Sequence, residues 1–214
     1  MEIKHFEFNI FGENTYLIWD STSLDAAVID PGMADGVDVR TFMDVVEEKS
    51  LSLRFILLTH IHIDHTFGVD ALKEQYPLLP VLAHRGDLGL AASRSQQAQM
   101  FHLPYKLRPL EIDRFVDEKT SLNLGPEEIK VICTPGHSAG GVCYYLPSSG
   151  ILFSGDTLFA GSIGRADLPG GNGRQLIFSI QEKLMKLPDN TIVLPGHGSP
   201  TSILREKQSN PYLL

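Results

Sequence analysis

Four short apolar runs each end in a loop that carries a histidine or an aspartate, and this recurrence constrains the fold more than any other feature of the chain. The runs are residues 55–58, 131–133, 151–153 and 192–194, and the loops after them read Thr-His, Thr-Pro-Gly-His, Ser-Gly-Asp and Pro-Gly-His. Ligand sites in layered α/β proteins lie outside the carboxyl ends of strands, and small residues let such loops turn sharply. The pattern therefore predicts four strands that deliver these side chains to one edge of the molecule.

Strand and helix patterns are mixed along the chain. The run at 131–133 extends back to residue 130 as a predicted strand of 130–133. Besides the four runs, strands are predicted at 5–10, 15–19, 26–29 and 141–146, and helices at 37–49, 68–76 and 175–187. Residues 84–102 fit a helix or a loop equally well. Residues 142–146 turn through 147–150 into residue 151 as an antiparallel hairpin would, which excludes a purely parallel sheet. We therefore expect an α/β layered architecture, and one domain over 1–214 because no linker-like stretch interrupts the chain.

Charge and composition narrow the partners. With 18 basic against 26 acidic residues the formal net charge is −8, which disfavours nucleic acid or an anionic membrane as a partner. No apolar run approaches the roughly 18 residues of a membrane span, and the first 13 residues lack a secretory pattern. The two cysteines, Cys133 and Cys143, are expected to be reduced thiols. We therefore expect a cytoplasmic protein that acts on a small molecule.

The densest cluster of polar side chains is His-Ile-His-Ile-Asp-His at residues 60–65. In a strand, residues 60, 62 and 64 would share a face, and in a helix 60 and 64 would align, so neither regular element gathers all four polar residues. A strand end that turns into a helix can instead place His60 and His62 on one side and Asp64 and His65 on the other.

The number of candidate ligands indicates two metal ions. A zinc ion takes about four ligands, and a catalytic zinc keeps one position for water. Two ions roughly 3.5 to 4 Å apart that share one carboxylate and one water would use all the candidates, and Asp156 is the expected bridge because it stands alone on its loop. Imidazoles and carboxylates without a thiolate suit zinc first, then iron or manganese. The seven candidates are His60, His62, Asp64, His65, His137, Asp156 and His197.

The motifs at 59–65, 134–141, 154–159 and 195–198 resemble those of the metallo-β-lactamase superfamily. The resemblance implies an αβ/βα sandwich, in which two mixed β-sheets pack face to face with helices outside and the metals lie at one edge. It also implies how the ligands are shared out. The first metal is held by His60, His62 and His137, the second by Asp64, His65 and His197, and Asp156 bridges them.

Residues outside the ligand set have two readings each. Asp30 matches a family position that is hydrogen-bonded near the histidine ligands, although an aspartate there also suits a simple turn. Arg165 and Asp167 resemble a family Gly-Arg-x-Asp element and form either an internal ion pair or a contact for a substrate anion. Phe101 and residues 105–106 (Tyr105 and Lys106) are candidates for the mouth of the site.

Residues 154–172 and 210–213 are similar to the glyoxalase II-like, single-domain hydrolases, and glyoxalase II hydrolyses S-lactoylglutathione, a thioester. The resulting hypothesis is a binuclear zinc-type site that activates a bridging hydroxide to cleave a thioester or an ester. Asp64 is expected to be a ligand that also accepts a proton from the water or helps to position the water. An alternative on the same scaffold is a persulfide dioxygenase with a single iron. A non-catalytic binding module is disfavoured because all seven candidate ligands are present.

Overall fold

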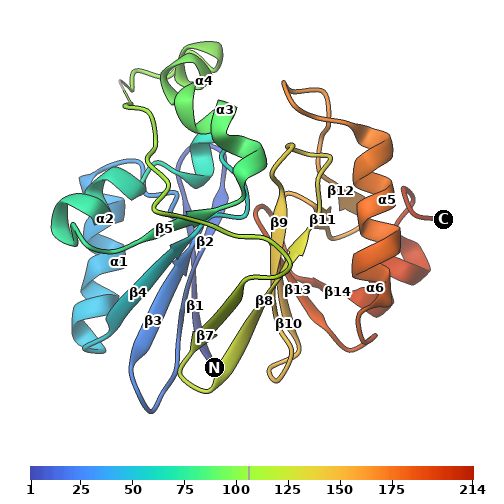
Figure 1. Ribbon diagram of the computed structural model, residues 1–214, viewed down its shortest axis with the longest axis horizontal. Coiled ribbons are helices and arrows are strands. Elements are labelled where there is room, and N and C mark those ends of the chain that lie inside the picture. The colour runs from blue at the N-terminus through green and yellow to red at the C-terminus, as the bar shows by residue number, and fades with distance from the viewer. Residues whose placement is uncertain (106) are drawn as a thin grey trace.

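Two six-stranded sheets pack face to face, with helices on their outer faces (Figure 1). The computed structural model describes residues 1–105 and 107–214, so Lys106 lies outside the described residues. In the first sheet, strands β1 to β3 are antiparallel and β3 to β6 are parallel. Its order is β1 (Glu2–Phe8), β2 (Glu13–Trp19), β3 (Asp25–Ile29), β4 (Ser52–Leu57), β5 (Val81–Ala83) and β6 (Arg114–Phe115).

The second sheet is also mixed, because β10 and β13 run parallel while its other pairs are antiparallel. Its order is β14 (Thr201–Ser202), β13 (Ile192–Pro195), β10 (Ile151–Gly155), β9 (Val142–Leu146), β8 (Glu127–Cys133) and β7 (Ser121–Leu124). The predicted antiparallel hairpin is the β9–β10 pair, with Leu146 opposite Ile151. A small ribbon of β11 (Leu158–Phe159) and β12 (Ser162–Ile163) follows β10. The expected sandwich of two mixed sheets is confirmed.

Each sheet is covered by helices whose apolar faces match it. Helices α1 (Gly36–Glu48) and α2 (Val69–Gln75) pack on the first sheet, and α5 (Gly173–Lys183) and α6 (Ile203–Ser209) pack on the second. The side chain of Asp35 caps α1 by accepting from two backbone amides, and Asn172 caps α5 in the same way through one amide. The buried face of α1 carries Phe42 and Val46, at the helical spacing that predicted it.

The interior is built in three apolar layers. The layer between the sheets contains Ile18 and Leu57 from the first sheet and Tyr144 and Phe153 from the second. Every residue of β2 is buried, because its alternate side chains enter this layer and the layer under α1. A strand buried on both faces fixes its register strongly, so the loops at its ends are held in place.

The shortest elements were not predicted from the sequence. The undecided segment 84–102 contains two short helices, α3 (Leu88–Ala92) and α4 (Arg94–Met100), and the helix expected at 175–187 ends at Lys183 in a 3₁₀ turn. Strands β5, β6 and β14 have two or three residues each, too few for a period of two to be visible. In the described part of the chain no helix is both long and apolar enough to cross a membrane.

Candidate metal centre

The loops after β4, β8, β10 and β13 meet at one end of the sandwich, as their sequences predict. His62 has an extended backbone, and a single turn of 3₁₀ helix follows it over Ile63–His65. This turn contains the next two ligands, Asp64 and His65. Ile61 and Ile63 are buried and anchor this turn in apolar cores. The change of backbone conformation after His62 places Asp64 and His65 in a second ligand group, with the His65 ring still beside that of His60, 4.1 Å between ring centroids.

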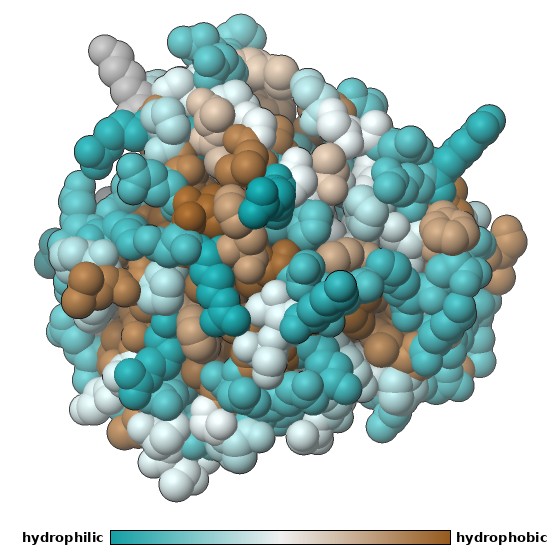
Figure 2. All heavy atoms as spheres, viewed as in Figure 1, coloured by the Kyte–Doolittle hydropathy of each residue, from teal (hydrophilic) through white to brown (hydrophobic). Residues whose placement is uncertain are grey.

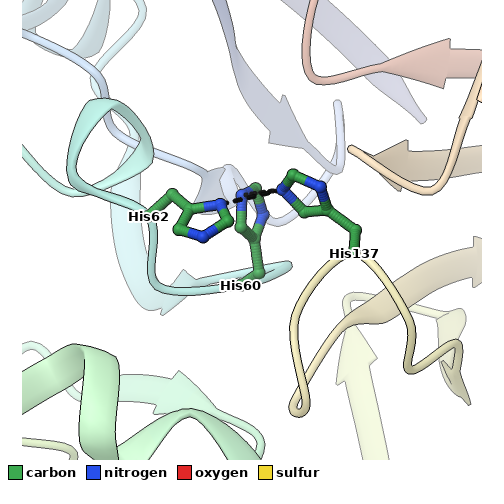
Figure 3. A group of neighbouring side chains, drawn as sticks. All are labelled: His60, His62 and His137. Atoms are coloured by element: carbon green, nitrogen blue, oxygen red, sulfur yellow. Dashed lines mark hydrogen bonds between the residues drawn. The ribbon is translucent and has the colours of Figure 1, made fainter. Parts of the chain in front are cut away.

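Three histidines form the first cluster (Figure 3). Nδ1 of His62 lies 2.8 Å from Nε2 of His137, which lies 3.2 Å from Nε2 of His60. Four ligands at about 2.0 to 2.1 Å around one tetrahedral ion are roughly 3.3 Å apart. The 3.2 Å separation matches this value, and the 2.8 Å pair would have to move apart by about 0.5 Å to share a zinc-sized cation. Burial and the neighbouring histidines lower the pKa of His60, and burial and His137 lower that of His62 to about 4. Both imidazoles are therefore neutral near pH 7, the form that binds a metal.

Asp64, His65 and His197 form the second cluster. Oδ2 of Asp64 lies 3.2 Å from Nε2 of His197 and 3.5 Å from Nε2 of His65. Burial opposes ionisation of Asp64, but His65 and His197 outweigh it and hold the pKa of Asp64 well below its usual range. Burial alone would lower the pKa of His65. The nearby carboxylates of Asp64 and Asp156 and the hydrogen bond to Asp30 outweigh burial, so the pKa of His65 lies well above its usual value. This cluster combines an ionised carboxylate with two histidines whose pKa values are raised, and a bound cation would take the place of the proton on each Nε2.

Asp156 lies between the two clusters. Its Oδ2 is 3.5 Å from Nε2 of His137 in the first cluster and 3.6 Å from Nε2 of His197 in the second, and its Oδ1 is 3.5 Å from Nε2 of His65. The preceding Gly155 has φ +49°, and a Cβ there would run into the Thr59 side chain, so only glycine lets this loop turn so close to the histidine motif.

The donor atoms of this site fit a pair of divalent cations. Nε2 of His65 and Oδ1 of Asp156 are buried and lack a hydrogen-bond partner among the described residues. Buried polar atoms without partners are costly, and a cation would satisfy both. Imidazole nitrogens and carboxylate oxygens without sulfur suit zinc, iron or manganese.

Asp30 joins the end of β3 to both the histidine motif and the second cluster. Its Oδ1 accepts from the backbone amide of Thr59 at 2.7 Å, and its Oδ2 accepts from the Thr59 hydroxyl at 2.5 Å and from Nδ1 of His65 at 3.1 Å. The residue is buried and has φ +49°. The carboxylate therefore does more than end a strand, because it fixes the ring that presents Nε2 to the site.

Two buried carboxylates of the site were not found from the sequence. Asp87 accepts from the amide of Ile61 at 3.1 Å, from Oγ of Ser138 at 2.9 Å and from the amide of Gly140 at 2.6 Å. It therefore ties the His60–His62 loop to the His137 loop. An aspartate just before a short helix is typical of a helix N-cap, but the Asp87 side chain makes no capping hydrogen bond to α3. No local pattern distinguishes the two roles.

The second missed carboxylate, Glu13, lies beneath His65. It is fully buried, its Oε1 is 3.9 Å from Nδ1 of His65, and its Oε2 accepts from the Thr15 hydroxyl at 2.8 Å. Burial raises its pKa well above the usual value. At the first residue of a strand, this glutamate has no sequence feature that sets it apart from a surface residue.

Arg165 and Asp167 form the internal ion pair that was one of their two expected roles. Two guanidinium nitrogens of Arg165 each lie 2.7 Å from a carboxylate oxygen of Asp167, and both side chains are exposed. The backbone carbonyl of Arg165 accepts from Nδ1 of His137 at 2.7 Å. This contact orients the His137 ring with its Nε2 toward the site, as ligand histidines are commonly held.

A cavity of about 340 Å³ opens onto both clusters. Besides metal-centre residues its lining is mostly apolar: Phe11, Phe101, Phe159, Arg165 and Leu168. Of the expected mouth residues, Phe101 lines the cavity, whereas Tyr105 packs against Phe67 at 5.0 Å between ring centroids. Figure 2 shows hydrophobic atoms gathered near the middle of this face, below the α3–α4 segment. The cavity can hold a small molecule with its reacting atoms beside the clustered ligands.

Comparison with known proteins shows the family. A model described as the metallo-beta-lactamase superfamily matches residues 9–197, and the chain belongs to that superfamily. It is 37% identical to the probable metallo-hydrolase YqgX of Bacillus subtilis over 92% of this chain and 90% of the relative. It is also 37% identical to the hydroxyacylglutathione hydrolase GloC of Haemophilus influenzae, over 100% of this chain and 98% of the relative.

A solved structure extends the comparison to the metal centre. The crystal structure of TTHA1623 in a di-iron-bound form is 36% identical, covers 98% of this chain and 100% of its own, and superposes with a TM-score of 0.86. The chain is therefore a metallo-hydrolase of the superfamily, with buried histidine and aspartate groups suited to binding metal.

Proposed function

We propose that this protein is a binuclear metallohydrolase that cleaves the thioester of a small acylated thiol, of the hydroxyacylglutathione type. The observation that carries the proposal is the position of Asp156, whose two oxygens lie within 3.6 Å of ligand nitrogens from both clusters. Two complete ligand groups around one shared carboxylate are what a two-metal hydrolase requires. The 37% identity to a hydroxyacylglutathione hydrolase over the whole chain supports the substrate class.

The proposed ligand sets follow the clusters. A first cation would be held by His60, His62 and His137 and a second by Asp64, His65 and His197, with Asp156 available to both. Two divalent cations bound there supply Lewis acidity, which brings the pKa of a water toward about 7 and polarises a carbonyl. We propose zinc because the donors are imidazoles and carboxylates, and the di-iron relative makes iron the main competitor.

The protein's own groups position the reactants. Asp64 is ionised, because neighbouring histidines lower its pKa, so its carboxylate can accept a hydrogen bond from the attacking water and help to position it. Asp30 and the carbonyl of Arg165 hold His65 and His137 by their Nδ1 atoms. Phe11 and Phe159 line the cavity and exclude bulk water from the reacting carbonyl, which strengthens the electrostatic interactions there.

The proposed setting is the cytoplasm. Cys133 and Cys143 are both free, as expected of thiols in a reducing compartment where small acylated thiols are also present. The proposed partner is a small molecule, and neither nucleic acid nor a membrane is part of the reaction. A persulfide dioxygenase would need one iron held by two histidines and an aspartate, which would leave the other four of the seven candidate ligands without a role.

An anaerobic assay separates these two reactions. S-lactoylglutathione incubated with the enzyme in the absence of oxygen should yield free glutathione, detected with a thiol reagent, at a rate that falls when a chelator strips the metal. Oxygen consumption with glutathione persulfide, together with no thiol release from the thioester, would replace the hydrolase by the dioxygenase.

A further inference from the structure

A second cavity of about 220 Å³ adjoins the cavity over the metal centre. The two cavities share His62, Phe101 and Leu168 in their linings, so the second cavity lies directly beside the first, next to the first ligand cluster. Helices α3 and α4 supply Leu90 and Met100 to the second cavity, and the loop before α5 supplies Leu168 with its neighbour Pro169. We call this second cavity the α4 groove.

Most of the side chains that line the α4 groove are apolar, among them Leu90, Met100 and Leu168. Met100 is 53% exposed and is one of the large hydrophobic side chains that the fold leaves uncovered. The polar residues Ser93, Gln96 and Gln97 also line the groove. The amide nitrogen of Gln97 donates to the carbonyls of Ile61 at 3.2 Å and Leu90 at 3.0 Å, and its buried Oε1 has no hydrogen-bond partner among the described residues. A flexible thioether beside aliphatic side chains adapts to apolar chains of different shape. An uncharged, apolar segment therefore suits this groove.

We propose that the α4 groove binds the acyl half of the thioester, and that the enzyme prefers unbranched apolar acyl chains longer than the two or three carbons of acetyl or lactoyl groups. The inference rests on the proposed hydrolase function. The thiol half of a glutathione thioester carries two carboxylates and an ammonium group, and burying such charges without partners is costly. The acyl half is the part of the substrate that an apolar groove can accept, while the charged half stays in the wider cavity near solvent.

A chain-length series tests the preference with the thiol held constant. S-acetyl-, S-butyryl-, S-hexanoyl- and S-octanoylglutathione differ only in methylene groups. Burying one methylene contributes about 0.8 kcal/mol, so kcat/KM should rise about fourfold per methylene until the groove is filled. A flat or falling series, with S-acetylglutathione still cleaved, would overturn the groove assignment and leave the hydrolase in place.

A binding experiment tests the groove without turnover. The thioethers S-methylglutathione and S-octylglutathione cannot be hydrolysed, and calorimetric titration of the metal-loaded enzyme should give the octyl compound the higher affinity by at least tenfold. Equal affinities would contradict the inference. If no thioester is cleaved but the octyl preference is present, the hydrolase proposal fails and the groove assignment stands.

Substitution of Met100 locates the effect. Met100→Glu puts a charge beside the bound octyl chain. The substitution should weaken the binding of S-octylglutathione by about tenfold or more and leave the binding of S-methylglutathione unchanged. The side chain is exposed at the end of α4, so the fold should tolerate the change. The matched control is Leu204→Glu on α6, an aliphatic residue that is 43% exposed and should leave both affinities unchanged. Equal losses for both thioethers in Met100→Glu would show that the α4 groove does not hold the alkyl chain.

Discussion

Nδ1 of His65 lies 3.1 Å from Oδ2 of Asp30, and the same carboxylate binds both the amide and the hydroxyl of Thr59. Asp30, which directly follows β3, therefore fixes Thr59 at the start of the histidine motif and also the orientation of the His65 ring. Because Nδ1 is held, Nε2 of His65 is the atom presented to Asp64 and Asp156. A metal at the second cluster would depend on this contact.

Asp30→Asn should weaken metal binding at the second cluster by about 10- to 100-fold, because an amide does not stabilise the His65 ring as a carboxylate does. The first metal should be affected much less. Metal titration of the stripped protein, followed by calorimetry, resolves the two affinities. Asp25→Asn is the matched control, since this aspartate lies at the other end of β3 and pairs with Arg54 at 2.6 Å. Unchanged binding in Asp30→Asn would show that the contact does not support the metal.

Asp156→Ala should lose metal and activity together. The substitution removes the carboxylate whose oxygens lie within 3.6 Å of Nε2 atoms from both clusters, so we expect less than one ion per chain and at least a 100-fold loss of turnover. Elemental analysis of the purified variant and a thioester assay on the same sample check this. His84→Ala should keep both, because His84 only accepts the amide of Gly86 at the start of a short turn. A variant at position 156 with two ions and full activity would refute the bridging role.

Asp87→Asn should destabilise the first cluster. Three donors converge on this carboxylate, and an amide group would turn an NH₂ toward at least one of them. We expect a loss of about 1 to 3 kcal/mol in the free energy of unfolding and weaker binding of the first metal. Denaturant unfolding and competition with a chelator measure the two effects, with Asp44→Asn on the exposed face of α1 as the control. If only stability changed, Asp87 would hold the fold without positioning the ligand loops.

Alkaline pH should destabilise the fold partly through Cys143. Burial raises the pKa of this thiol from its ordinary value of 9.0 to about 11, so above pH 9 the unfolded chain loses the proton while the folded chain keeps it. Stability is fully present below pH 9 and falls as pH rises toward 11, by about 3 kcal/mol from this group. Burial raises the pKa values of Tyr16 and Tyr144 in the same direction.

Cys143→Ala tests that linkage. Wild type and variant are unfolded with urea at pH 8 and pH 11. The variant should be less stable at pH 8, because a buried side chain has been shortened. Between the two pH values its free energy of unfolding should fall by about 3 kcal/mol less than that of the wild type. Parallel stability curves over this range would mean that the Cys143 thiol does not titrate with unfolding.

The ligand set could be predicted from the sequence because each ligand follows a strand signal or lies in one dense motif. The sandwich could be predicted through the same motifs, although strands as short as β5 and β6 leave no periodic pattern. The roles of Glu13 and Asp87 could not be predicted from the sequence. Glu13 contacts His65, and Asp87 contacts two ligand loops, all of which are remote from them in the sequence. The α4 groove also depends on tertiary packing, because it brings Met100 beside Leu168.

The metal content of each chain tests the central claim most directly. Protein purified without added metal and analysed by plasma mass spectrometry should contain about two divalent ions per chain, since two ligand groups share Asp156. Chelation should remove both ions and restoring zinc should return both. A saturating content of one ion per chain, unchanged when excess zinc or iron is supplied, would contradict the binuclear centre.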